Sequence, residues 1–169
     1  MAYAPTIVST AFIDACLEHD EIPDPEDFLL VDKAQEKQLR VSLTLSKERA
    51  EENQNKLFEG RSFYCLPNVN GGFDTYNRIV QANGGQCMQY QGRKGTRVKS
   101  HRAGSEGADD ENTDVYLISP DDGDNSKLWQ QFESMVLSSR MTPRIVGTDW
   151  LIESAMRQEI VPVAEYLLA

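Results

Sequence analysis

The sequence predicts an α/β fold of three layers, in which a central, mostly parallel sheet of four strands is flanked by helices. One observation is the order of segments from residue 57 to residue 168, where short apolar runs alternate with stretches whose apolar residues recur at helical spacing. This alternation favours a parallel sheet, because right-handed crossovers place the helices on its two faces. The other observation is an internal repeat, since residues 6–30 align without gaps to residues 144–168.

The region that begins at residue 57 opens with two predicted strands separated by a helix. Ser62 to Leu66 is rich in aromatic residues, which is typical of a strand, and a turn cluster fills residues 67–72. The helix that follows stops at Asn83-Gly84-Gly85, because these residues tolerate positive φ. Cys87 to Tyr90 is the second strand. The apolar stripe of the helix consists of Phe73, Tyr76, Ile79 and Val80.

The second half of this region repeats the pattern after a long polar loop. Asp114 to Ser119 forms a third strand, and Asn125 or Ser126 caps a helix. Arg144 to Val146 is a short buried strand, and Thr148 caps the last helix. The middle helix has an apolar stripe made of Leu128, Trp129, Phe132, Met135 and Val136, and the last helix carries Trp150 and Leu151, which we assign to the core.

The internal repeat sets the domain boundaries. Each copy consists of a short buried strand, a Ser or Thr that caps a helix, a helix led by an aromatic residue, and a closing Phe-Leu-Leu or Tyr-Leu-Leu. Only five residues precede the first copy, so we expect residues 1–30 to be the C-terminal part of a truncated first module. Residues 31–56 are then an inter-domain linker that contains a helix, and residues 57–169 are a complete module. Identical pairs at the offset of 138 are Ile7/Ile145, Val8/Val146, Thr10/Thr148, Glu21/Glu159, Ile22/Ile160, Leu29/Leu167 and Leu30/Leu168.

The linker shows two patterns. Apolar residues alternate with polar ones at Leu39, Val41, Leu43 and Leu45, which predicts an extended segment. Residues 47–56 are highly charged and lack Gly and Pro, which predicts a helix that begins after Ser46. The favoured interpretation of this helix is a solvated connector, and the alternative is a partner-binding helix.

Composition excludes several classes of function. A net charge of −10 disfavours binding to the phosphate backbone of nucleic acids. Three scattered cysteines, Cys16, Cys65 and Cys87, with only His19 and His101 beside them, predict no structural metal and a reducing compartment. Neither histidine lies in a recognisable catalytic motif, so we expect no enzyme and no cofactor. No apolar run is long enough to span a membrane.

The long polar loop over residues 93–112 is basic in its first part and acidic in its second. We interpret it as a solvated insert, because charge runs usually face solvent. A basic contact to nucleic acid, or a localisation signal, is the alternative.

Four features together resemble the BRCT domain family. They are the first strand ending near Leu66, the Gly84-Gly85 pair after the first helix, the strand 114–119, and Trp150 in the last helix. Residues 57–87 look most similar to the C-terminal BRCT pair of fungal multi-BRCT DNA-damage scaffolds of the regulator-of-Ty-transposition type. The resemblance implies the three-layer BRCT fold and a non-enzymatic protein-interaction module of the DNA damage response. Implied partners are a phosphorylated protein or histone tail and other DNA-repair proteins, in the nucleus.

The resemblance also implies where a phosphopeptide would bind. In tandem BRCT pairs, a hydroxyl after the first strand and a lysine on the second helix of the first module hold the phosphate, and both would lie upstream of Met1. Lys127 matches that lysine in the complete module and is a possible phosphate contact, but Leu66-Pro67 replaces the hydroxyl-glycine pattern. The second module then lines the groove for the peptide residues that follow the phosphate. The groove candidates are Asn70, Gly71, Gly72, Phe73, Thr148, Asp149 and Ile152.

Two alternatives stay open at this point. The groove candidates could serve only as turn and helix-cap residues. The module could also bind proteins without phosphorylation, or bind DNA ends, and the salt dependence of DNA affinity would separate these functions.

Overall fold

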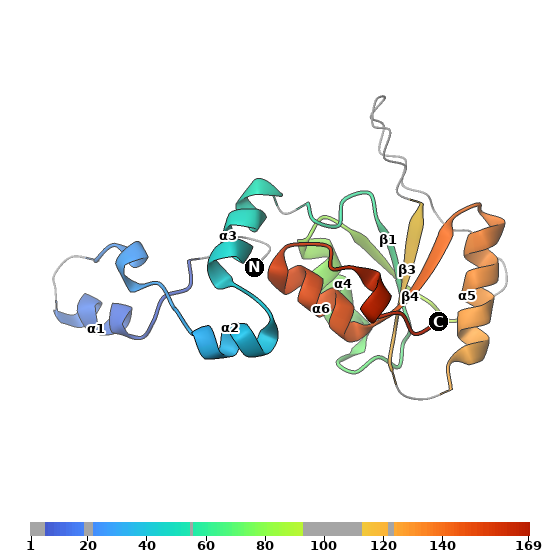
Figure 1. Cartoon of the computed structure of the whole chain (residues 1–169), viewed down its shortest axis with the longest axis horizontal. Coiled ribbons are helices and arrows are strands. Elements are labelled where there is room, and N and C mark those ends of the chain that lie inside the picture. The colour runs from blue at the N-terminus through green and yellow to red at the C-terminus, as the bar shows by residue number, and fades with distance from the viewer. Residues whose placement is uncertain (1–5, 19–21, 55, 93–112, 122–123) are drawn as a thin grey trace, which may run out of the picture.

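The computed structural model describes residues 6–18, 22–54, 56–92, 113–121 and 124–169. An α/β unit lies at one end of the molecule, and the short helices of the N-terminal part of the chain extend away from it, with α1 farthest from it (Figure 1). The elements, in chain order, are α1 (Ala11–Glu18), η1 (Pro25–Phe28), α2 (Lys33–Leu39), α3 (Leu43–Glu52), β1 (Ser62–Cys65), α4 (Gly72–Ala82), β2 (Gln86–Gln89), β3 (Asp114–Ser119), α5 (Ser126–Ser138), β4 (Thr142–Gly147), α6 (Thr148–Arg157) and η2 (Val163–Glu165).

The sheet has four strands in the order β2-β1-β3-β4, and every neighbouring pair is parallel. Ser62 at the start of β1 lies opposite Gln86 of β2 and Val115 of β3. The predicted sequence of strands and helices after residue 57 is confirmed. So is the predicted sheet of four mostly parallel strands.

The helices cover the sheet on two sides, with α4 and α6 on one side and α5 on the other (Figure 1). Under α6, the fully buried ring of Trp150 stacks on Tyr116 with centroids 4.7 Å apart, and Tyr116 stacks on Phe63 at 5.2 Å. Under α5, Phe132 meets Tyr64 edge to face at 5.6 Å. Buried aromatic rings therefore fill both interfaces between helices and sheet, as the apolar stripes predict.

Of two predicted helix caps, the position of Asn125 is confirmed and that of Thr148 is wrong. Thr148 is the first residue of α6, and Gly147 occupies the N-cap position without a side-chain bond. Asn125 does hold the N-cap position of α5, but its side chain makes no capping bond there. Gly147 is extended and buried, and a Cβ at this position would lie 2.6 Å from Oδ1 of Asp121.

The internal repeat is also a structural repeat. In each copy, the short strand pairs antiparallel with the closing segment through two backbone hydrogen bonds and one isolated bridge. The bonds of the first copy are Ser9 N to Phe28 O at 2.8 Å and Leu30 N to Ile7 O at 2.9 Å, and those of the second are Gly147 N to Tyr166 O at 3.2 Å and Leu168 N to Ile145 O at 2.9 Å. All these partners are related by the same offset of 138, so the two copies share the same pairing of strand and closing segment.

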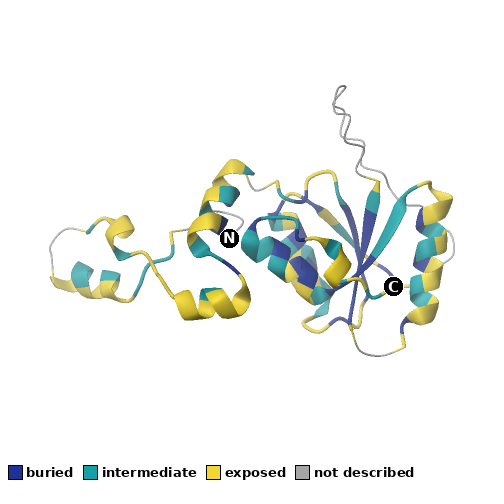
Figure 2. Cartoon of the chain, viewed as in Figure 1, coloured by how far each residue is buried: buried dark blue, intermediate teal, exposed yellow. Residues whose placement is uncertain are grey.

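No described residue of the first copy is buried, so the prediction of a short buried strand at its start is wrong. No residue of α1 is buried, and the side chains of Ile13 and Leu17 are 59% and 81% exposed. In the second copy, the equivalent residues of Ile13 and Cys16, namely Leu151 and Ser154, are fully buried. Figure 2 shows the difference as a largely exposed N-terminal end beside a buried sheet. The same sequence pattern is buried only where a sheet lies beneath it.

The linker is helical where alternation predicted an extended segment. Helix α2 is capped by Asp32, whose Oδ1 accepts a hydrogen bond from Gln35 N at 3.0 Å. Helix α3 begins at Leu43, before the predicted start after Ser46, and Ser42 Oγ accepts from Leu45 N at 3.4 Å. Arg40 separates the two helices in the left-handed region, with φ of 54°. Two local caps therefore outweigh a period-two pattern that is only four apolar residues long.

Helix α3 packs on α6, so the interpretation as a solvated connector is wrong for one of its faces. Ser46 and Ala50 are each only 1% exposed. The opposite face keeps the charged residues in solvent, among them Glu48 and Glu52.

Candidate functional site

The candidate residues gather at one edge of the sheet because of its topology. All four strands are parallel, so their carboxyl ends share an edge. Helices α4, α5 and α6 follow β1, β3 and β4 directly, and their N-termini meet this edge. In open α/β sheets, ligands bind outside the carboxyl ends of the strands. The groove candidates and Lys127 thus lie at the edge of the sheet where the strands end.

The entrance to α4 is a fixed turn that exposes its tip. Tyr76 Oη donates a hydrogen bond to Asn70 O at 2.7 Å, and Thr75 Oγ1 donates to Gly71 O at 2.7 Å. Gly71 and Gly72 have φ of +87° and +77°, which a side chain would strain. Asn70 and Gly71 are exposed, so the turn presents an amide side chain and open backbone to solvent.

Phe73 has a second role. Its ring is half-buried and packs against the hydrophobic core, whereas Asn70 and Gly71 are exposed. Of the four candidates at the α4 entrance, Phe73 is therefore the one that also anchors the helix to the sheet.

The start of α6 combines polar and apolar exposure. Asp149 in the first turn is exposed, Thr148 is half-buried, and Ile152 one turn later has 36% of its surface exposed. The carboxylate of Asp121 lies against Gly147, directly before the helix. Two acidic side chains therefore stand at this helix N-terminus, where an anionic ligand would otherwise be favoured.

Lys127 is exposed in the first turn of α5. A carboxylate already occupies this helix start, because Asp124 Oδ1 accepts from Ser126 Oγ at 2.6 Å and from Ser126 N at 3.3 Å. These two bonds hold the pKa of Asp124 below its ordinary value. At the end of β1, Leu66 is fully buried and Pro67 is exposed, so no hydroxyl is present at the strand end.

A hydrogen bond joins the loop after β1 to the N-cap of α5 at this edge. Asn68 Nδ2, in the loop after β1, donates to Oδ1 of Asn125, the buried N-cap residue of α5, at 3.3 Å. Asn68, Asn125 and Asp121 were not among the site residues predicted from the sequence. Asparagine in a turn cluster and at a cap was visible in the sequence, but the contact across 57 residues was not.

A polar latch joins α3 to the far end of α6. Arg49 Nη1 donates to Arg157 O at 3.2 Å and pairs with Glu159 Oε2 at 2.8 Å. Asn53 Nδ2 donates to Gln158 O at 3.1 Å. The five residues Arg49, Asn53, Arg157, Gln158 and Glu159 form this latch, which fixes the linker helix to the segment 57–169.

Gln158 is the centre of the latch. It is 1% exposed, has φ of 51°, and donates from Nε2 to Asn83 Oδ1 at 2.9 Å. The C-terminal end of α6 is thereby tied to the end of α4 as well as to α3.

Neither the buried thiol of Cys65 nor the half-buried thiol of Cys87 is prepared for chemistry. Burial raises the pKa of Cys65 to about 12 and that of Cys87 to about 12, so both thiols stay protonated near neutral pH. Among the residues that the structure describes, no three His, Cys, Asp or Glu side chains are grouped to hold a metal ion. None of the helices in the described ranges is long and apolar enough to cross a membrane.

Comparisons with known proteins agree with this architecture. The BRCT-containing protein 1 of Schizosaccharomyces pombe is 29% identical over 160 residues, which cover 94% of this chain and 17% of that protein. The BRCA1-associated RING domain protein 1 of Arabidopsis thaliana is 27% identical over 168 residues, which cover 93% of this chain and 22% of that protein. The chain therefore spans only a small part of the curated relatives it matches.

Solved structures match nearly the whole chain. The BRCT5-BRCT6 domains of S. pombe Brc1 superpose with a TM-score of 0.69 at 28% identity, over 96% of this chain and 71% of that one. Rtt107p in complex with phosphorylated histone H2A shares the fold at a TM-score of 0.54 and 15% identity, over 97% of this chain and 66% of that one. The model of the BRCT domain matches residues 56–167. The match to the family model, the parallel four-stranded sheet and its flanking helices show that the chain belongs to the BRCT domain family.

Proposed function

We propose that this chain is a non-enzymatic protein-interaction unit of a nuclear DNA-damage scaffold, and that it helps a tandem BRCT pair to recognise a phosphorylated partner. In this proposal, residues 1–30 are the C-terminal part of a first BRCT domain, residues 31–56 link the domains, and residues 57–169 are the complete second domain. A phosphorylated histone tail is the partner class that the Rtt107p complex suggests.

The observation that carries the proposal is the docking of α3 on α6. Ser46 and Ala50 are buried there, and the latch adds the ion pair of Arg49 with Glu159 at 2.8 Å. The linker therefore holds the first repeat copy in a set position against the complete module. Two modules held in this way can form one continuous peptide-binding surface. Two modules joined by a flexible tether do not keep one relative orientation and cannot form such a surface.

In this surface, the complete module contacts the peptide and the first module holds the phosphate. The exposed turn of Asn70 and Gly71 offers an amide and backbone groups, and Ile152 offers an apolar contact. The α5 and α6 starts each have a carboxylate beside them, from Asp124 and Asp121. A phosphate would be repelled by both, so Lys127 is not its main contact.

The proposal predicts that phosphopeptide affinity rises when the first module is complete. Isothermal titration calorimetry with a phosphorylated histone H2A tail peptide compares the affinity of this 169-residue chain with that of a longer chain that includes upstream sequence. Each lost charge-assisted hydrogen bond costs about 1.5–3 kcal/mol, so the shorter chain is expected to bind weaker by one to several orders of magnitude.

The unphosphorylated peptide is the control in both titrations, and Lys127→Ala in the shorter chain is expected to change little. Tight binding of the phosphopeptide by the shorter chain, abolished by Lys127→Ala, would contradict the assignment of the phosphate to the first module.

A second candidate function is recognition of an unphosphorylated protein at the same edge. It is favoured by the two carboxylates beside the helix starts, which suit a neutral or basic peptide. Equal affinity of the longer chain for phosphorylated and unphosphorylated peptides would select it. DNA-end binding is opposed by the net charge of −10 and would show itself as a steep loss of affinity with salt.

A further inference from the structure

Asparagine is followed directly by glycine at two places in the chain, Asn70-Gly71 and Asn83-Gly84. In this dipeptide the backbone nitrogen of glycine can attack the side-chain amide carbon of asparagine, because glycine has no side chain to hinder the approach. The dipeptide is the same at both places, so the surroundings of each pair in the fold decide whether it reacts.

The fold holds both reacting groups of the second pair. Asn83 is 3% exposed, its Nδ2 donates to Ile79 O at 2.8 Å, and its Oδ1 accepts from Gln158 Nε2 at 2.9 Å. The backbone nitrogen of Gly84 is also bonded, because it donates to Gln81 O at 3.0 Å. Attack at Asn83 therefore requires three hydrogen bonds to break first.

The first pair leaves both reacting groups free. Asn70 is exposed, and neither its side-chain amide nor the backbone nitrogen of Gly71 forms a hydrogen bond with any residue that the structure describes. The two bonds that fix this turn end on carbonyl oxygens, from Tyr76 Oη to Asn70 O and from Thr75 Oγ1 to Gly71 O. The turn is thus held in place while the amide carbon and the attacking nitrogen stay available.

A buried hydroxyl group promotes the reaction at Asn70. Tyr76 is 4% exposed, and its Oη donates to Asn70 O at 2.7 Å. This oxygen belongs to the same peptide group as the nitrogen of Gly71, so it takes up negative charge when that nitrogen loses its proton, and a fixed donor stabilises the charge. Asn83 O has a donor too, Phe58 N at 2.8 Å, so the two pairs differ in their reacting groups and not in this oxygen.

We infer that Asn70 is a site of spontaneous deamidation, promoted by the hydroxyl group of Tyr76. The nitrogen of Gly71 loses its proton and forms a bond to Cγ of Asn70, and the side-chain nitrogen of Asn70 leaves with a proton as ammonia. Water then adds to one of the two carbonyl carbons of the succinimide ring and opens it to aspartate or isoaspartate. The reaction consumes one water, releases one ammonia and needs no other reactant.

The product adds a carboxylate at the entrance to α4. This is the same edge of the sheet at which Asp121 and Asp124 already lie beside helix starts. In the proposed function, on which this consequence rests, the amide of Asn70 faces the peptide. Its replacement by a negative charge therefore weakens the binding of a phosphorylated peptide.

Peptide mapping measures the reaction without any ligand. The 169-residue chain is incubated at neutral pH, and trypsin then places the two pairs on separate fragments, residues 62–78 and 79–93, in which mass spectrometry detects the change from amide to acid. Asn70 is expected to react at least about tenfold faster than Asn83, because Asn83 must first break its hydrogen bonds. In a denaturing concentration of urea the two rates are expected to become similar. Equal rates in the folded chain would overturn the inference.

Two variants test the role of the hydroxyl group. Tyr76→Phe keeps the buried ring, and is expected to slow the reaction at Asn70 by about 3- to 10-fold in the folded chain but not in urea. Thr75→Val is the matched control, because it removes the neighbouring donor, whose acceptor Gly71 O is outside the reacting peptide group. It is expected to change the rate little. An unchanged or faster reaction in Tyr76→Phe would refute the promotion by Tyr76.

The effect on binding is measured separately in the longer chain that includes upstream sequence. Calorimetric titration of the phosphorylated peptide compares Asn70→Asp with Asn70→Gln, and the Asp variant is expected to bind about three- to tenfold weaker. Equal affinities of the two variants would remove Asn70 from the peptide-binding surface. The rates from peptide mapping do not depend on this titration, so failure of the deamidation site and failure of the proposed function are distinguishable.

Discussion

At the scale of single residues, Trp150 stabilises the fold through two kinds of contact. Its ring is fully buried and stacked on Tyr116 at 4.7 Å, and its indole Nε1 donates to Val161 O at 2.9 Å. The bond ties the loop after α6 to the helix, and the stack ties the helix to β3. No part of the side chain is free to meet a partner.

Replacing Trp150 by Ala is therefore expected to lower the free energy of unfolding by about 3–5 kcal/mol, because the cavity cannot be refilled by the packed rings around it. Chemical denaturation measures the change, with unfolding monitored by far-UV circular dichroism because this signal does not depend on the deleted tryptophan. Ile152→Ala on the same helix is the control, and because Ile152 is 36% exposed its effect is expected to be much smaller. A Trp150→Ala protein as stable as the parent would refute the core assignment.

Only some features of the candidate site could be predicted from the sequence. The turn that contains Asn70 and Gly71 follows from its Asn and Gly residues, because positive φ is cheapest there. The carboxylate of Asp121 beside Gly147 does not follow, because a long-range contact between two loops leaves no local pattern.

At the scale of elements, α3 differs most from its predicted role. It lies on α6 with Ser46 and Ala50 buried, and the latch holds its C-terminal turn. Small residues on one face of a charged helix are a weak sign of docking, since Ser and Ala add little apolar surface to that face. The docking face was therefore easy to overlook.

Removing the latch is expected to loosen α3 without unfolding the sheet. The double change Arg49→Ala with Asn53→Ala deletes an exposed ion pair of about 0.2–1 kcal/mol and two hydrogen bonds of about 0.5–1.5 kcal/mol each, to Arg157 O and Gln158 O. Amide hydrogen exchange in α3 is then expected to accelerate by roughly 5-fold or more.

Glu52→Ala is the matched control, because Glu52 is exposed on the same helix and forms no ion pair within the described residues. Unchanged exchange in the double variant would show that burial of Ala50 alone holds the helix.

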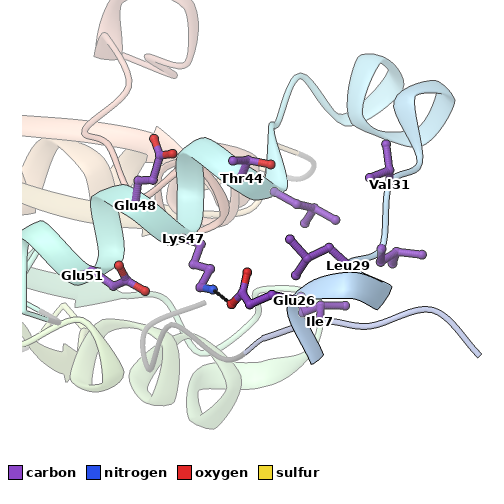
Figure 3. Close-up of a pocket in the computed structure, with 10 residues that line it drawn as sticks. Ile7, Glu26, Leu29, Val31, Thr44, Lys47, Glu48 and Glu51 are labelled. Atoms are coloured by element: carbon purple, nitrogen blue, oxygen red, sulfur yellow. Dashed lines mark hydrogen bonds and ion pairs between the residues drawn. The ribbon is translucent and has the colours of Figure 1, made fainter. Parts of the chain in front are cut away.

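At the scale of the whole molecule, exposed apolar residues are unevenly distributed. Among the described residues of the segment 57–169, three large apolar side chains are exposed, Leu137, Ile152 and Leu167. The N-terminal part exposes many more, namely Ile13, Leu17, Ile22, Leu29, Leu30, Val31, Leu39 and Leu45. Leu29 and Val31 line a groove together with Ile7, and residues of α3 form its other side (Figure 3). Such a concentration of exposed apolar residues marks an interaction surface. It fits the proposal that further structure of the same protein covers this end.

The segment 93–112 lies outside the described residues, and its interpretation as a solvated insert stays a prediction. Replacing it with a short Gly-Ser linker is expected to leave the melting temperature nearly unchanged, because the segment has no apolar period to bury. Differential scanning calorimetry is the measurement, and a drop of many degrees would mean that the segment packs on the module.

The sequence by itself determined the order of elements from β1 to α6, the residues of the core and the repeat of the two ends. These features are local or periodic, and burial imposes them on the residue pattern directly. Only the tertiary structure decided that Leu43 starts a helix, that Arg49 reaches Arg157, and that Ile7 lines a groove. The state of a short segment with conflicting local patterns, contacts between distant segments and the presence of a sheet beneath a strand depend on three-dimensional neighbours, which a pattern along the chain does not encode.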